Sequence, residues 1–123
     1  MKDFCIIGSG ISGATIANTL SKKYSLDLYD KAKGVGGRSS NKKLNKNESF
    51  DHGAQYISPK SSEFKKFIKN LIDKRIVKNW SGKHVFLNTD KKVDKKHIKI
   101  IGKNGNNAIS KYLLKDINCN FNS

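Results

Sequence analysis

The sequence has few cysteines, few arginines and no long run of apolar residues. Its two cysteines, Cys5 and Cys119, lie near opposite ends of the chain and outside any Cys-x-x-Cys or Cys/His spacing. They therefore predict neither a disulfide scaffold nor a metal site, and a reducing cytoplasmic location is expected. The longest apolar run near the start covers residues 4–7, which is too short for a transmembrane helix or a secretory signal. We expect a soluble protein with no membrane partner.

Acidic residues are also scarce. The chain has 10 Asp and Glu against 25 Lys and Arg, which gives a net charge of +15. Such an excess is typical of proteins that bind phosphate backbones. However, only Arg38 and Arg75 are arginines, and arginine is the side chain best suited to phosphates and guanine edges. The chain also lacks an RNP-like, zinc-finger or helix-turn-helix signature. We interpret the charge as a compositional bias and expect no nucleic-acid partner; a lysine-rich nucleic-acid binder is one alternative.

The first thirty residues predict a β-α-β unit. Residues Asp3–Ile7 form a short apolar run typical of a strand, and Leu26–Asp30 alternates as a second strand does. Between them, apolar residues recur at helical intervals from Ser12 to Lys22. With 123 residues, the chain has the size of one domain. The fold class predicted is α/β, with a Rossmann-like β-α-β unit.

A glycine pattern, Gly8-x-Gly10-x-x-Gly13, lies between the first strand and the helix, where the dinucleotide-binding fingerprint is found. Gly8 is expected to make the turn, Gly10 to let the backbone approach a pyrophosphate, and Gly13 to let helix and strand pack closely. The helix start at Ser12 would then present unpaired N–H groups to the phosphates. The pattern in this position predicts nucleotide binding.

Asp30 ends the second strand, where a carboxylate can accept hydrogen bonds from ribose hydroxyls. A carboxylate would repel a 2′-phosphate, so NADP is disfavoured while FAD and NAD remain open. Six residues later, Gly36-Gly37-Arg38 forms a second glycine turn, whose arginine can make paired, charge-assisted bonds to the same pyrophosphate. A plain exposed loop is the alternative interpretation of this segment.

Three segments in order, CIIGSGISG, LYDKAKGVGGRSS and SFDHGAQYIS, resemble the N-terminal flavin-binding part of the FAD-dependent amine-oxidase superfamily, most closely its renalase-like branch. The resemblance covers roughly residues 3–58, with a weaker echo at 100–114. It implies FAD as the cofactor and a reduced amine or dihydronicotinamide-type compound as the substrate, with oxygen as a candidate acceptor. The implied FAD-binding residues are Gly8, Gly10, Ile11, Ser12, Gly13, Asp30, Lys31, Gly36, Gly37, Arg38, Gly53, Ala54 and Gln55.

In this resemblance, the segment from Asp51 to Tyr56 runs near the flavin ring. His52 in that segment is interpreted as a structural, hydrogen-bonding residue, with general-base catalysis as the alternative. No catalytic residue is predicted. Single aromatic residues such as Tyr56 and Trp80 more commonly bury area than line a substrate pocket.

The chain is divided into a FAD-binding unit over residues 1–58 and the start of a substrate-side region over 59–123. An amphipathic helix is predicted from Ser62 to Lys74, with its apolar stripe in the core. Val85–Leu87 and His97–Ile101 are expected to form strands of a hairpin, and a last helix begins at Ala108 and ends near Lys115. Residues 41–48 are expected to be a polar connector, and no element is assigned to 118–123.

Members of the family are much longer, and a parallel sheet of only two strands cannot bury both faces. The chain is therefore predicted to be an incomplete domain, an N-terminal piece of the enzyme; an unusual reduced domain is the alternative. A second chain could supply the missing part. A further hypothesis of another class is a non-catalytic nucleotide-binding module or a split-enzyme subunit.

Overall fold

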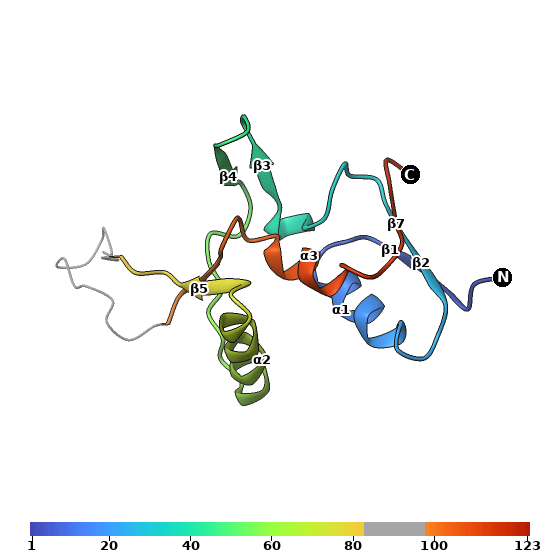
Figure 1. The fold of residues 1–123 in the computed structure, drawn as a ribbon, viewed down its shortest axis with the longest axis horizontal. Coiled ribbons are helices and arrows are strands. Elements are labelled where there is room, and N and C mark those ends of the chain that lie inside the picture. The colour runs from blue at the N-terminus through green and yellow to red at the C-terminus, as the bar shows by residue number, and fades with distance from the viewer. Residues whose placement is uncertain (83–97) are drawn as a thin grey trace.

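The computed structural model describes residues 1–82 and 98–123. At one end lies a parallel sheet in the order β1-β2-β7, formed by Phe4–Ile7, Leu26–Asp30 and Cys119–Phe121. Both chain termini lie at this end of the molecule (Figure 1). Helix α1 (Ile11–Leu20) connects β1 to β2, so the predicted β-α-β unit is confirmed.

One face of the parallel sheet is covered and the other is open. Leu26 and Leu28 of β2 are buried in one core cluster with Ala14 and Ala17 of α1. On the opposite face, Ile7 is 78% exposed, and its neighbours Cys5 and Tyr29 are also exposed. Parallel sheets are normally buried on both faces, so the described residues cover only half of what this sheet requires.

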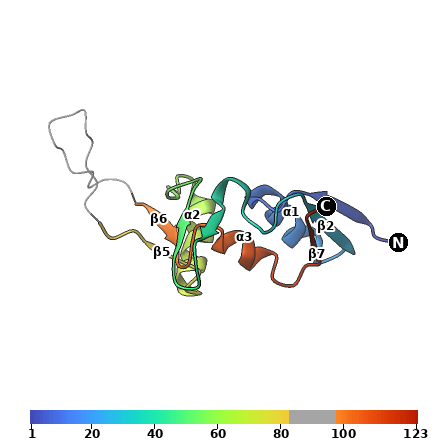
Figure 2. The same cartoon turned by 90° about the horizontal axis from the view of Figure 1, so that it is seen from above.

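Helix α3 (Ala108–Leu113) joins the two ends of the molecule. It lies between α1 of the parallel-sheet end and α2 of the other end (Figure 2). Ile109 and Leu113 are buried in the same core cluster as Ala14 and Ala17 of α1. The predicted last helix is therefore present, although it ends at Leu113, two residues before the expected end near Lys115.

Helix α2 (Ser62–Asp73) confirms the amphipathic helix predicted from the apolar stripe. The Ser61 hydroxyl caps its N-terminus by accepting a hydrogen bond from the Phe64 N–H at 3.2 Å. Ile68 and Leu71 are buried, with Phe64 and Phe67 packed partly buried beside them. The stripe lies in the core, as expected.

The polar connector predicted over residues 41–48 was wrong in part. Asn41–Lys43 forms strand β3, which pairs antiparallel with β4 (Ser49–Asp51), and the hairpin projects from the molecule (Figure 1). The turn is built by Asn45, whose side-chain oxygen accepts hydrogen bonds from the N–H groups of Asn47 and Glu48 at 2.9 Å. This hairpin therefore forms from polar residues, because the asparagine turn sets the register of its two strands. It has no apolar face from which the sequence could have predicted it.

A second antiparallel pair joins β5 (Val77–Asn79) to β6 (Ile100–Gly102). Strand β5 was not predicted, and it takes β6 as its partner. The expected strand Val85–Leu87 and residue 97 lie outside the described residues, so that hairpin is not tested. Val77 and Ile100 are almost fully buried and connect this pair to the core.

The expectation of a two-stranded parallel sheet was wrong, because β7 pairs with β2 as a third strand, Leu28 facing Cys119. Residues 118–123 were given no element in the sequence analysis, since three residues show no usable periodicity. No helix within residues 1–82 and 98–123 is both long and apolar enough to cross a membrane.

Candidate nucleotide site

A cleft of about 580 Å³ lies at the carboxyl end of β1, between the two glycine loops. The N-terminus of α1 forms one wall, and residues of α2, α3 and the segment after β4 form the other. The lining residues are Ile7, Gly8, Gly10, Ile11, Ser12, Gly13, Gly36, Gly37, Arg38, Ser39, Ala54, Ile57, Phe64, Asn106 and Ile109. Nine of the thirteen residues predicted to bind the cofactor thus lie around one cavity.

The first glycine loop turns the chain from β1 directly into α1. Gly8 has a positive φ of 99°, which side chains of L-residues rarely tolerate. A Cβ at Gly13 would overlap the Gly8 carbonyl oxygen, so only glycine lets the first turn of α1 lie this close to the strand end. No side chain among residues 1–82 and 98–123 caps α1, whose N-cap is Gly10. The first-turn N–H groups are therefore directed to the cleft without a side-chain partner.

The second glycine loop lies against the first. Gly36 and Gly10 form an isolated parallel β-bridge, and the Gly36 N–H donates to the Ser9 carbonyl at 3.2 Å. The short helix η1 (Gly37–Ser39) follows, and it carries Arg38 on the exposed rim of the cleft. The two motifs, more than twenty residues apart in sequence, are thus one continuous surface.

Asp30 is held against the first glycine loop by Ser9. One carboxylate oxygen accepts from both the Ser9 N–H, at 2.7 Å, and the Ser9 hydroxyl, and the other accepts from the Ala32 N–H at 2.9 Å. Partial burial raises the pKa of Asp30, but the hydrogen bonds from Ser9 and Ala32 and the charge of Lys31 outweigh it. The net pKa lies below the ordinary value, so the carboxylate is charged at neutral pH.

A second hollow of about 590 Å³ opens on the other side of Asp30. It is lined by Cys5, Ile7, Gly8, Tyr29, Asp30, Lys31 and Ser123. Ile7 and Gly8 belong to both cavities. Asp30 and Lys31 therefore do not line the glycine cleft itself, but they line a hollow that continues from it around the end of β1.

The segment after β4 also approaches the second glycine loop. The Ala54 N–H donates to the Arg38 carbonyl oxygen at 2.8 Å, and a Cβ at Gly53 would overlap the same oxygen. Ala54 lines the cleft, whereas Gly53 and Gln55 are exposed and are not among its lining residues. The close approach at Gly53 sets the position of this segment.

Comparison with known proteins supports the Rossmann-like fold. Residues 6–71 match the NAD(P)-binding Rossmann-like domain family. The chain belongs to this family.

Solved structures of putrescine oxidase share the fold of this Rossmann-like domain. One is a double mutant from a redesign of cofactor binding, with 23% identity, a TM-score of 0.52, and coverage of 78% of this chain and 21% of that chain. The wild type bound to putrescine aligns with a TM-score of 0.50 at the same identity and coverage. The present chain thus spans about a fifth of the length of the putrescine oxidase chains it matches.

His52 of the Rossmann-like domain lies outside the cleft. It is exposed, and its Nε2 lies 3.1 Å from the Ser40 hydroxyl oxygen, with the Phe50 ring 6.1 Å away. Its contacts are those of a hydrogen-bonded side chain at the base of the hairpin. Among the described residues, no three His, Cys, Asp or Glu side chains come together in a way that could hold a metal ion.

Several residues of the cleft were not predicted as site residues. Ile57, Phe64 and Ile109 form its apolar wall, and Asn106 lies at its floor with 1% of its surface exposed. Phe64 was assigned to the core from its place in the apolar stripe, and in the structure it both packs against the core and lines the cleft. Asn106 gave no sequence signal beyond belonging to a glycine-containing turn, because its partners lie about fifty residues away.

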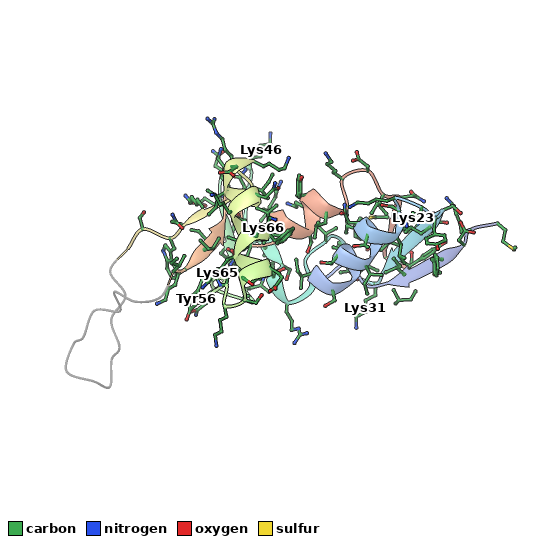
Figure 3. All side chains as sticks on the ribbon, turned by 90° about the horizontal axis from the view of Figure 1, so that it is seen from below. Lys23, Lys31, Lys46, Tyr56, Lys65 and Lys66 are labelled. Atoms are coloured by element: carbon green, nitrogen blue, oxygen red, sulfur yellow. The ribbon has the colours of Figure 1, made fainter. Side chains whose placement is uncertain are left out.

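Within the part of the chain that the structure describes, lysines lie on several different elements. Figure 3 shows Lys23 and Lys31 on the parallel-sheet end, Lys46 on the β3–β4 hairpin, and Lys65 and Lys66 on α2. The excess positive charge is therefore not confined to one element.

Proposed function

We propose that this chain is the FAD-binding part of an FAD-dependent oxidoreductase of the amine-oxidase type, within its renalase-like branch. One observation carries the proposal: the two glycine loops pair through Gly10 and Gly36, while Ser9 ties Asp30 to the same loop. A dinucleotide is long enough to occupy both hollows that meet at Gly8, and few other ligands require both.

The residues present fit the cofactor. The uncapped N-terminus of α1 offers N–H donors and a positive dipole end to a pyrophosphate. Arg38, on the rim of the same cleft, supplies the charged fork. Asp30 and Lys31 line the neighbouring hollow, where the adenosine ribose would lie. The Asp30 oxygen that accepts from the Ala32 N–H keeps a lone pair for a hydroxyl donor, whereas the other oxygen already accepts two bonds from Ser9.

The chemistry that FAD would supply is the uptake of a hydride from a reduced amine or a dihydronicotinamide-type substrate. The protein's part is to hold the ring and keep water from it, and the apolar wall of Ile57, Phe64 and Ile109 beside Ala54 is suited to that. The amine class is favoured by the fold shared with putrescine oxidase, whose structure was solved with putrescine. No residue is assigned as a catalytic acid or base.

The whole enzyme is proposed to be larger than this chain. The open face of the parallel sheet, with Ile7 78% exposed, and the one-fifth coverage of putrescine oxidase support this proposal. The missing part would lie in further polypeptide of the same protein or in a second chain, acting in the cytoplasm. A non-catalytic nucleotide-binding module is the second candidate, since the pairing of the glycine loops and the bond from Ser9 to Asp30 need no catalytic residue.

The test is to purify the chain and measure bound flavin by absorbance, then titrate FAD, NADH and NADPH. We expect a yellow protein, weak FAD binding, no preference for NADPH, and little turnover. Arg38→Ala should weaken FAD binding about tenfold or more, while Arg75→Ala, the matched control at the other arginine, should not. Unchanged FAD affinity in Arg38→Ala would remove the site assignment.

The oxidoreductase and the non-catalytic module predict different results when the missing region is added. Supplying the polypeptide that carries the missing region should restore turnover of an amine or dihydronicotinamide substrate if the chain is part of an oxidoreductase. Tight flavin binding with no turnover in that reconstituted protein would favour the non-catalytic module. Full turnover by this chain alone would contradict its proposed incompleteness.

A further inference from the structure

Asn106 makes hydrogen bonds with every polar group of its side chain. The side-chain oxygen accepts from the Gly102 N–H at 2.9 Å. The side-chain nitrogen donates to the Ala54 carbonyl at 2.6 Å and to the Gln55 carbonyl at 3.1 Å. The side chain is 1% exposed, so these bonds form away from bulk water, where losing a partner is most costly.

The main chain of Asn106 adds a fourth bond. Its N–H donates to the Asp51 carboxylate at 2.8 Å, and the same oxygen accepts from the Asn41 side chain at 3.1 Å. Asn106 therefore binds the end of β4 at Asp51 and the segment after β4 at Ala54 and Gln55. Only an amide side chain of this length can accept from Gly102 and donate twice to carbonyls.

The next residue, Asn107, contacts the second glycine loop. Its side-chain nitrogen donates to the Val35 carbonyl at 3.3 Å. A Cβ at Gly36 would lie 2.9 Å from the Asn107 Cβ, which is too close for any residue but glycine. The two adjacent asparagines thus hold different loops, Asn106 the segment at 54–55 and Asn107 the segment at 35–36.

We propose that the Asn106–Asn107 pair is a positioning clamp that fixes the segment at residues 53–55 relative to the second glycine loop, and so sets how the isoalloxazine ring is held. The proposal rests on the proposed FAD-binding function and deepens it. The Ala54 peptide is held on both sides, by the Arg38 carbonyl at its N–H and by Asn106 at its C=O. Both asparagines act through the loops they hold, not by contact with the ring.

The test uses Asn106→Asp, which keeps the size and the acceptor for Gly102 but turns two donors into a carboxylate facing two carbonyl oxygens. In the chain without FAD, we expect faster hydrogen exchange in peptides covering 53–55. With FAD, we expect affinity to fall about tenfold or more, and the visible circular dichroism of the bound flavin to change at saturating FAD. Asn104→Asp is the matched control, because it adds the same charge at an exposed position two residues away.

If Asn106→Asp does not fold, Asp51→Ala is the second variant. At this exposed side chain, it removes the bond to the Asn106 N–H and the bond to the Asn41 side chain. We expect the same changes, reduced to a few-fold loss of FAD affinity. A variant that exchanges faster at 53–55 but binds FAD with wild-type affinity and spectrum overturns the clamp's role and leaves the proposed function standing. A wild-type chain that binds no FAD overturns the proposed function itself.

Discussion

Helices α1 and α2 are packed in opposite ways. Helix α1 buries the small residues Ala14 and Ala17, whereas 52% of the surface of its Ile16 is exposed. Helix α2 buries Ile68 and Leu71 and exposes its lysines. One helix is placed by close approach of backbones, the other by burial of large apolar side chains.

The difference follows from what each helix positions. The N-terminus of α1 has to lie against the end of β1 for its N–H groups to face the cleft, and large side chains would hold the two apart. Helix α2 contributes one residue, Phe64, to the lining of the cleft, so apolar burial is sufficient to place it. The parallel-sheet end therefore brings backbone N–H groups to the cleft, while the α2 end contributes the large apolar side chains of Ile68, Leu71, Val77 and Ile100 to the core.

The largest expected effect concerns the α2 end. Leu71→Ala leaves a cavity at a fully buried position and should lower the free energy of unfolding by about 2–5 kcal/mol. Chemical denaturation would measure it, with Leu44→Ala, at a side chain that is 65% exposed, as the control. FAD affinity of the folded fraction should stay near that of the wild type, because Leu71 is not among the residues that line the cleft. An equally large loss of FAD affinity would contradict the division of roles between the two ends.

Gly13→Ala should act on both stability and binding. The added methyl overlaps the Gly8 carbonyl oxygen, and the resulting shift of α1 should cost about 1–3 kcal/mol of unfolding free energy. FAD titration should also show weaker binding, since the helix N-terminus moves. Gly34→Ala is the control, because a Cβ there meets nothing within 4 Å. Equal behaviour of the two variants would mean that the close approach has no role.

Lowering the pH should reduce the free energy of unfolding through protonation of Asp30 at the parallel-sheet end. Its pKa is depressed in the folded chain, so its stabilisation is complete above its ordinary value of 3.8 and is lost as the pH falls through the lower folded value. The effect is expected to be less than about 1 kcal/mol, because the carboxyl is only partly buried. Urea midpoints of the wild type and Asp30→Asn, measured from pH 7 to 3, should converge at the acid end. A constant gap over that range would exclude this titration.

The smallest effect is expected at Ser110 of α3. Its hydroxyl is fully buried and has no hydrogen-bond partner among residues 1–82 and 98–123. Ser110→Ala should therefore be neutral or stabilise by up to about 1 kcal/mol. Ser9→Ala, which removes a buried hydroxyl that bonds to Asp30, should instead destabilise in the same thermal unfolding experiment.

Much of the site could be predicted from the sequence because its signals are local. Gly8, Gly10 and Gly13 follow a strand and begin a helix, and Asp30 ends the next strand, so short-range geometry brings them together. The meeting of Gly36 with Gly10 was expected only as a shared approach to a ligand; the structure adds a direct backbone bridge. Asn106 could not have been identified, since its importance lies entirely in contacts with residues 51–55.

The sequence alone determined the β-α-β unit, the amphipathic helix α2 and the two glycine turns, because periodicity and glycine geometry act within a few residues. Only the tertiary structure decided that β7 joins β2, that β5 pairs with β6, and that an asparagine pair ties the loops together. Main-chain pairing is nearly independent of side-chain identity, and a strand of three residues carries too little pattern to name its partner.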